Sequence, residues 1–266
     1  MVKKEIFKLK ANDIEFYCEM AGQGPLVVIA PDGSNDCTPY ESFLNELCGK
    51  YTVLTFDMRG GLRSMDHYPK KVTPSVLGDD VAEIVRIIDK GKATVYGCSS
   101  GGQAVLAAGK RHPELFRNIL VHEAALQADV PLPGTGFSYF MNLNSFSDYF
   151  TNSLTPNDFW GICNAEKAMG IGAETRERIE KNGEFWSEWY LGTVDMDTYT
   201  AEDFALMPPT AFTVGTWTPS WLTYANVQVA KRGNCRIQWV ESSHHPEITC
   251  PKEYAIYMDE MISRYL

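Results

Sequence analysis

The sequence predicts an α/β fold with a mostly parallel central sheet and an inserted helical cap. Short continuous apolar runs, such as Leu26–Ala30 and Ala93–Cys98, alternate along the chain with segments of helical periodicity. Strands of this kind are covered on both faces, and repeated strand–helix units form a parallel sheet through right-handed crossovers. The alternation stops between about residues 126 and 203, where aromatic residues gather and continuous apolar strands are missing. We therefore assign residues 1–125 and 204–266 to one core and residues 126–203 to the cap.

The chain opens with a predicted hairpin and then enters the β/α pattern. Apolar and polar residues alternate in Glu5–Leu9 and Ile14–Glu19, as they do in half-buried antiparallel strands. Apolar residues recur with helical spacing over Pro74–Ile88, and Thr73 before them is a suitable N-cap. The other predicted strands are Tyr51–Phe56, Asn118–His122, Thr210–Val214 and Cys235–Val240, and the other predicted helices are Tyr40–Cys48, Gln103–Arg111, Pro219–Ala230 and Pro251–Tyr265.

Length and charge limit the classes of function. A chain of 266 residues with 44% hydrophobic residues can bury one large core with a modest inserted subdomain. The 24 basic and 34 acidic residues give a net charge of −10, and the basic residues are scattered, which disfavours a nucleic-acid partner. The amino end lacks the apolar segment of a secretory signal, and no apolar run reaches membrane-spanning length. A small-molecule substrate is the expected partner, and the aromatic cap could also support a homodimer.

The cysteines favour a reducing compartment. There are seven, they are widely spaced, and they contain no Cys-x-x-Cys pair, which argues against both a disulfide framework and a zinc site. The sequence also lacks other metal-ligand spacings and the G-x-G-x-x-G dinucleotide fingerprint. We therefore expect a cytoplasmic protein that uses neither a metal nor a cofactor.

A candidate nucleophile lies where a predicted strand meets a predicted helix. Gly97-Cys98-Ser99-Ser100-Gly101 matches G-x-S-x-G, the nucleophile elbow of the α/β-hydrolase fold, and it has the strand–turn–helix context that this motif requires. Ser99 is the expected nucleophile. Ser100 is the alternative, but Cys98 would then occupy the position of the first glycine. We interpret Cys98 as a packing residue rather than a second nucleophile.

A serine nucleophile needs a base and an acid at the same edge of the sheet. His244 and His245 follow the last predicted strand, so either could be the base, with His244 preferred. The strand Thr210–Val214, after which many enzymes of this fold place the acid, is followed by no acidic residue, whereas the preceding strand runs directly into Glu123. Glu123 is therefore the expected acid, with Glu202 and Asp203 as alternatives.

Two backbone amides are expected to stabilise the oxyanion. In this fold one belongs to the residue after the nucleophile and the other to the loop after the third strand. Ser100 and Gly33 occupy those positions. Asp32, beside Gly33, could cap or brace the loop.

With these residues in view, the chain resembles the fungal zearalenone lactonases, α/β-hydrolases that open the macrocyclic ester of a resorcylic acid lactone. The resemblance runs nearly from end to end. It rests on Pro31-Asp32-Gly33, Thr55-Phe56-Asp57-Met58, Arg63-Ser64, Ala93-Thr94-Val95, the elbow at residues 97–101, His122-Glu123, Thr213-Val214-Gly215, Thr218-Pro219 and His244 with Pro246.

The resemblance implies a site and an activity. Ser99, Glu123 and His244 match the family's triad, which favours His244 over His245, and Gly33 and Ser100 match its oxyanion donors. Trp186 matches a cap tryptophan that contacts the ligand, and Trp189 and Tyr190 are further candidates for substrate binding, although ordinary packing explains them equally well. The implied activity is lactone hydrolysis. A general carboxylesterase, a carbon–carbon hydrolase and a ligand receptor on the same fold are the alternatives.

Overall fold

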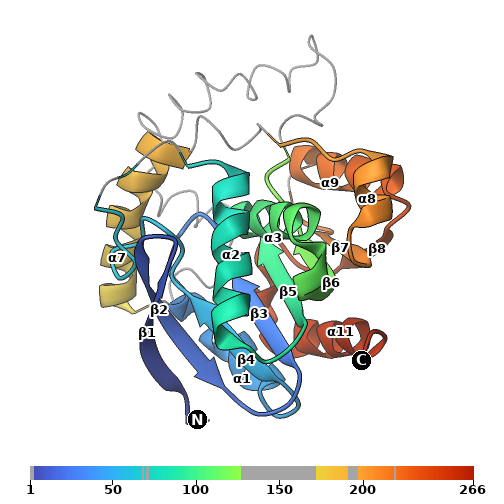
Figure 1. Ribbon diagram of the computed structural model, residues 1–266. Helices are drawn as coiled ribbons and strands as arrows, with labels where there is room; N and C mark the ends of the chain where they lie inside the picture. The colour runs from blue at the N-terminus through green and yellow to red at the C-terminus, as the bar shows by residue number, and fades with distance from the viewer. Residues whose placement is uncertain (1–2, 68, 70–71, 127–171, 191–196, 219) are drawn as a thin grey trace.

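A computed structural model describes residues 3–67, 69, 72–126, 172–190, 197–218 and 220–266 (Figure 1). Its centre is an eight-stranded sheet with the order β1-β2-β4-β3-β5-β6-β7-β8. The strands are β1 (Glu5–Ala11), β2 (Ile14–Ala21), β3 (Leu26–Ala30), β4 (Thr52–Phe56), β5 (Ala93–Cys98), β6 (Phe116–His122), β7 (Thr210–Gly215) and β8 (Arg236–Val240). β1 and β2 form an antiparallel hairpin, β2 pairs antiparallel with β4, and every pair from β4 to β8 is parallel. The expected α/β-hydrolase sheet is therefore confirmed.

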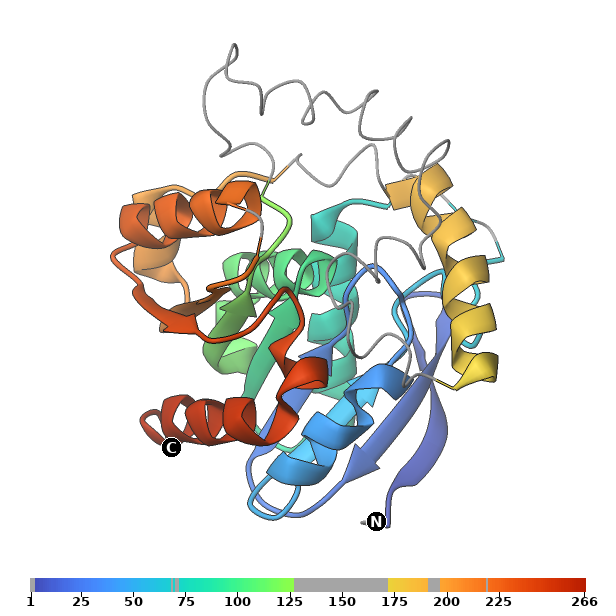
Figure 2. The same ribbon diagram turned by 180° about the vertical axis from the view of Figure 1, so that it is seen from behind.

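Helices cover both faces of this sheet (Figures 1 and 2). The helical elements are η1 (Thr38–Tyr40), α1 (Glu41–Leu47), α2 (Pro74–Ile88), α3 (Ser100–Arg111), η2 (Pro113–Leu115), α7 (Ala173–Phe185), η5 (Trp186–Tyr190), α8 (Ala201–Leu206), α9 (Ser220–Arg232), α10 (Pro246–Thr249) and α11 (Pro251–Ser263). α2 and α3 pack together on one face, and α1 and α11 pack together on the other. None of the helices in the described ranges is long and apolar enough to cross a membrane.

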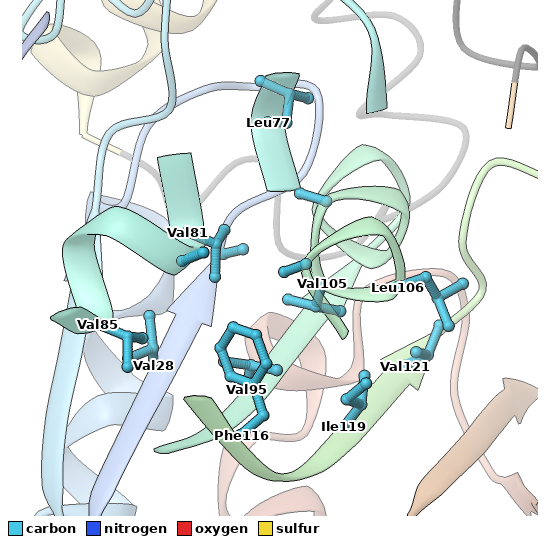
Figure 3. Close-up of a cluster of buried hydrophobic side chains, with 14 of the residues drawn as sticks. Val28, Leu77, Val81, Val85, Val95, Val105, Leu106, Phe116, Ile119 and Val121 are labelled. Carbon is cyan, nitrogen blue, oxygen red and sulfur yellow. The ribbon is translucent and has the colours of Figure 1, made fainter. Parts of the chain in front are cut away.

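The apolar core consists of two clusters, one on each face of the sheet. Figure 3 shows part of the larger cluster, in which Val81 and Val85 of α2 and Val105 of α3 lie over Val28 and Val95 of the central strands. These side chains are all buried. Because helices cover both faces of the central strands, every strand position faces the core, which explains the continuous apolar runs in the sequence. Burial of one such side chain contributes about 1.5–3 kcal/mol. The central strands are thereby held in place beneath the site.

Some helix boundaries match the sequence-based expectations and others differ from them. α2 begins at Pro74 as expected, and the hydroxyl of Thr73 accepts a hydrogen bond from the amide of Val76. α3 begins at Ser100 rather than at the expected Gln103, because the chain turns directly from β5 into the helix at Ser99. α8 and the short helix α10 had not been predicted.

The described part of the expected cap includes α7 and the π-helical segment η5 that follows it. α7 lies on the opposite side of the molecule from α8 and α9 (Figures 1 and 2). α8 crosses the boundary that we placed at residue 203. Much of the cap, residues 127–171 and 191–196, lies outside the described residues.

Candidate active site

The elbow at Ser99 has the backbone geometry that presents a nucleophile. Ser99 lies between β5 and α3 with φ 55° and ψ −120°, in a region that residues other than glycine seldom adopt. A Cβ atom on Gly97 would lie 2.1 Å from the carbonyl oxygen of Gly101, and one on Gly101 would lie 2.3 Å from that of Ala30. The turn therefore requires glycine at both flanks. Ser99 is only partly buried, whereas Cys98 and Ser100 on either side are buried.

The expected acid and base lie in contact, although 121 positions separate them in the sequence. Glu123 directly follows β6, and His244 follows β8. Nδ1 of His244 and Oε2 of Glu123 are 2.8 Å apart, and both side chains are buried. The other carboxylate oxygen, Oε1, accepts a hydrogen bond of 2.7 Å from the amide of Gly215 at the end of β7. Three neighbouring strand ends thus fix this pair.

The surroundings of Glu123 keep its carboxylate ionised. Burial alone would raise its pKa, but His122, the hydrogen bond from His244 and the amide of Gly215 lower the pKa below its usual value. Burial lowers the pKa of His122 to about 4, so at neutral pH its ring is uncharged and the hydrogen bonds from His244 and Gly215 are the contacts that stabilise the carboxylate. Nδ1 of His122 lies 2.8 Å from the hydroxyl of Thr213. An ionised Glu123 accepts a hydrogen bond from the Nδ1–H group of His244, so the lone pair of that ring lies on Nε2.

Nε2 of His244 is buried and has no hydrogen-bond partner within the described ranges. The ring atom that would take the proton of Ser99 is therefore available. A hydrogen bond between Ser99 and His244 is not formed in this arrangement, and in enzymes without substrate such bonds are often long or poorly aligned.

The two expected oxyanion donors lie at the start of α3 and in the loop after β3. Ser100 is the first residue of α3, where the amides of the first turn lack intrahelical acceptors. Gly33 is flanked by residues with fixed backbones. The amide of Asp32 donates to the hydroxyl of Tyr40, and the amide of Ser34 donates to the Asp32 carboxylate at 3.2 Å.

Of the three expected cap residues, Trp186 and Tyr190 lie beside the elbow. A Cβ atom on Gly33 would be 3.0 Å from the indole nitrogen of Trp186, so this ring lies directly against the glycine. Trp186, Tyr190 and Ser100 line the same small cavity, together with Asn35, Met58, Arg59, Val72, Leu77 and Phe185. Trp189 does not line that cavity. It is partly buried against the core, and its carbonyl accepts a hydrogen bond from the amide of Val72.

His245, the alternative base, belongs to a second buried cluster that sequence reasoning missed. Its Nε2 lies 3.3 Å from Asp32 and its Nδ1 lies 3.1 Å from Glu247. Burial alone would lower the pKa of His245, but the two carboxylates raise it overall. The sequence signal was Glu247, an acidic residue two positions after a histidine. The cluster joins the loop of Gly33 to the loop that carries His244.

The alternative acids lie on α8, away from His244. Asp203 forms the capping box of α8 with Thr200 and an ion pair with Lys110, and Glu202 is exposed on the same helix. Cys98 is buried, and its Sγ lies 3.2 Å from the carbonyl of His244.

Metal-ligand atoms come together in two places within the described ranges. One group is Cys98, His244 and His245, and the other is His122, Glu123 and His244. His244, which belongs to both groups, already uses Nδ1 to contact Glu123. A cation at either place would compete with the acid–base pair for His244.

Comparison with known proteins identifies the class. A family model described as "alpha/beta hydrolase fold" matches residues 22–157. A putative aryl esterase from Burkholderia cenocepacia superposes with a TM-score of 0.75 at 14% identity, covering 98% of this chain and 99% of that one. An enol-lactonase from Burkholderia xenovorans superposes with a TM-score of 0.70 at 16% identity, and the match covers 96% of this chain and 99% of that one.

Two curated relatives are more similar in sequence. A zearalenone hydrolase from Bionectria ochroleuca is 30% identical over 260 residues, covering 96% of each chain. A zearalenone hydrolase from Cladophialophora bantiana is 30% identical over 268 residues, covering 97% of this chain and 96% of the relative. The chain is thus a hydrolase that belongs to the α/β-hydrolase family, and within it to the group of the zearalenone hydrolases.

Proposed function

We propose that this protein is a serine lactonase that opens the macrocyclic ester of zearalenone or a related resorcylic acid lactone. The observation that carries the proposal is the buried contact of 2.8 Å between His244 and Glu123, at the sheet edge where the strained Ser99 also lies. The relatives named zearalenone hydrolase support the choice of substrate.

The proposed acylation begins when Oγ of Ser99 attacks the carbonyl carbon of the lactone. Nε2 of His244 takes the serine proton, and the ionised Glu123 stabilises the imidazolium through Nδ1. The amides of Gly33 and Ser100 donate to the oxyanion, and one such donor is worth about 2.7–4 kcal/mol of barrier. His244 then returns its proton to the ring oxygen, the ester bond breaks, and the new hydroxyl stays on the acyl chain.

Deacylation uses the same groups in reverse order. Water gives a proton to Nε2 of His244 and attacks the acyl carbon. The tetrahedral intermediate collapses, Ser99 recovers its proton, and one hydroxy acid leaves. The sum is one lactone and one water converted to one hydroxy acid.

The surroundings of Ser99 support a neutral, aromatic ligand. Trp186, Tyr190 and Phe185 contribute aromatic rings to the cavity beside the elbow, and Leu77 adds an aliphatic side chain. Aromatic and aliphatic side chains of this kind line sites for apolar ligands, and Asn35 and Arg59 add polar groups to the same lining. A resorcylic ring with an apolar macrocycle has that character.

The test is incubation of the purified protein with zearalenone, with the products followed by chromatography and mass. The wild type should yield a product heavier by one water, and Ser99→Ala should yield none. Ser100→Ala, which keeps the backbone amide, should lose far less turnover than Ser99→Ala and so decide between the two serines.

Other results would direct the assignment to an alternative. Turnover of simple esters without ring opening would indicate a general carboxylesterase, and cleavage of a carbon–carbon bond would indicate a hydrolase of that class. Tight retention of zearalenone by the wild type with negligible turnover would favour a receptor. Each of these results contradicts the lactonase proposal.

A further inference from the structure

One face of the cap helix α7 contacts the loop that carries Gly33. Arg178 and Asn182 lie four residues apart on α7, and Trp186, four residues further on, is the first residue of η5, so the three residues lie along one side of this helical segment. Arg178 donates from Nε to Asp36 at 2.7 Å, Asn182 donates from Nδ2 to the carbonyl of Ser34 at 2.7 Å, and Trp186 lies against Gly33. The helix and the loop therefore run past each other in opposite directions.

The loop turns where the helix contacts it. The amide of Asn35 donates to the carbonyl of Asp32 at 3.0 Å, and Asn35 has a φ of 52°, in the left-handed region. The loop contacts of Arg178 and Asn182 are two residues apart, at Asp36 and Ser34. Arg178 contacts Asp36, and Asn182, one helical turn later, contacts Ser34, which comes earlier in the loop.

Asn182 is the central contact of this face and uses both atoms of its amide. Its Nδ2 donates to the Ser34 carbonyl, and its Oδ1 accepts a hydrogen bond of 2.8 Å from the amide of Leu62. The side chain is buried, with 1% exposure. Asn182 therefore connects the cap to two core loops at once.

The loop around Gly33 is held from both sides, and on its C-terminal side α7 acts together with Arg63 of the core, which forms an ion pair with Asp36. On the N-terminal side, Tyr40 accepts a hydrogen bond from the amide of Asp32. On the C-terminal side, the peptide of Ser34 is bound through its carbonyl by Asn182 of α7. The backbone position of Gly33 depends on both anchors, since it lies between them.

We propose that Asn182 is a positioning residue, through which the cap helix sets the Gly33 amide for oxyanion stabilisation. This inference rests on the proposed function, because it concerns the same serine site. Its consequence is that the cap governs the rate of acylation as well as substrate binding.

The test uses Asn182→Asp, which preserves the size of the side chain and the acceptor for Leu62 but replaces the donor to Ser34 with a carboxylate oxygen. Lys181→Ala is the matched control, because Lys181 is exposed and pairs only with Glu177 among the described residues. For zearalenone, kcat of Asn182→Asp should fall by about tenfold or more, with KM changed less than about twofold, as expected when a transition-state interaction alone weakens. The control should match the wild type.

A second readout separates this inference from the substrate assignment. A fluorophosphonate modifies an activated serine through an oxyanion-like transition state, so its rate of reaction with Ser99 requires no zearalenone. Asn182→Asp should react about tenfold more slowly than the wild type. If the wild type is phosphonylated but leaves zearalenone intact, the proposed substrate is wrong while the role of Asn182 is still measured.

Two results would overturn the inference. One is phosphonylation of Asn182→Asp at the wild-type rate, and the other is a loss of kcat/KM that comes entirely from KM, which would mean that the helix only shapes the pocket. Should Asn182→Asp fail to fold, Arg178→Gln replaces it, since Asp36 keeps its ion pair with Arg63. This variant should slow phosphonylation in the same direction, and an unchanged rate would count against the inference.

Discussion

Replacement of Glu123 by glutamine gives a sharp test of the acid–base pair, because the structure dictates how the new amide must lie. The amide of Gly215 donates to Oε1 at 2.7 Å, so the carboxamide oxygen of the substituted side chain must face it, since the NH₂ group would oppose another donor. The NH₂ group then faces Nδ1 of His244, where the carboxylate now accepts at 2.8 Å. His244 must accept at Nδ1 and carry its proton on Nε2.

In this tautomer Nε2 can no longer take the proton of Ser99. The corresponding acid-to-amide change in serine proteases lowers kcat by about 10⁴, which corresponds to about 5 kcal/mol of barrier. We expect a loss of the same order for Glu123→Gln, with the fold retained, because the side chain keeps its size and its bond to Gly215. The assay is steady-state ring opening of zearalenone, with circular dichroism as the check of folding.

Glu247→Gln is the matched control for this change. Glu247 contacts Nδ1 of the adjacent His245 at 3.1 Å and accepts from Tyr96 at 2.9 Å, so the same substitution is made beside a histidine that is not the proposed base. Its kcat should fall by less than about tenfold. The reasoning is refuted if Glu123→Gln stays within about tenfold of the wild type, or if the two variants lose equal activity.

Three further changes test neighbouring features. His245→Asn leaves the carboxylates of Asp32 and Glu247 buried without their shared partner, so it should destabilise the fold by about 3–5 kcal/mol in denaturant unfolding while keeping measurable turnover; loss of turnover in a stable variant would contradict the assignment of the base. The folded-state pKa of His122, about 4, lies below its unfolded value of 6.5, so its neutral form contributes up to about 3 kcal/mol that is fully present above pH 6.5 and lost as the pH falls toward 4. His122→Asn should therefore show a shallower acid loss of Tm than the wild type, and parallel Tm profiles would disprove this linkage. Thr73→Ala removes the N-cap of α2 and should lower stability by about 1 kcal/mol without changing kcat, as chemical denaturation and the turnover assay would reveal.

Much of the fold could be predicted because its signals are local. β5 is predicted at its observed bounds, Ala93–Cys98, because a strand covered on both faces must be apolar at every position. α2 is likewise predicted from its apolar stripe and from the N-cap at Thr73. α10 was missed because a helix of four residues is too short to show a helical period.

Some of the site could likewise be predicted from the sequence, and some could not. The elbow motif located Ser99, since the glycines that its turn requires lie beside it in the sequence. The order of strands pointed to Glu123 and to the pair His244 and His245, because parallel strands bring their carboxyl ends to one edge, and the family resemblance favoured His244. The link between His245, Asp32 and Glu247 was missed, because it joins loops that are far apart in the chain.

By itself, the sequence determined the parallel sheet, the elbow and the candidate residues at the sheet edge, because each depends on residue type at short spacing. Only the tertiary structure showed the contact between His244 and Glu123, and it alone showed that Asp32 and Glu247 contact His245. His244 and His245 are adjacent in the chain, but their ring nitrogens contact different carboxylates, and those partners come from other strands and loops. The same reason explains the contact of Asn182 with Ser34: no local pattern records it, since it exists only after α7 has packed against the loop that follows β3.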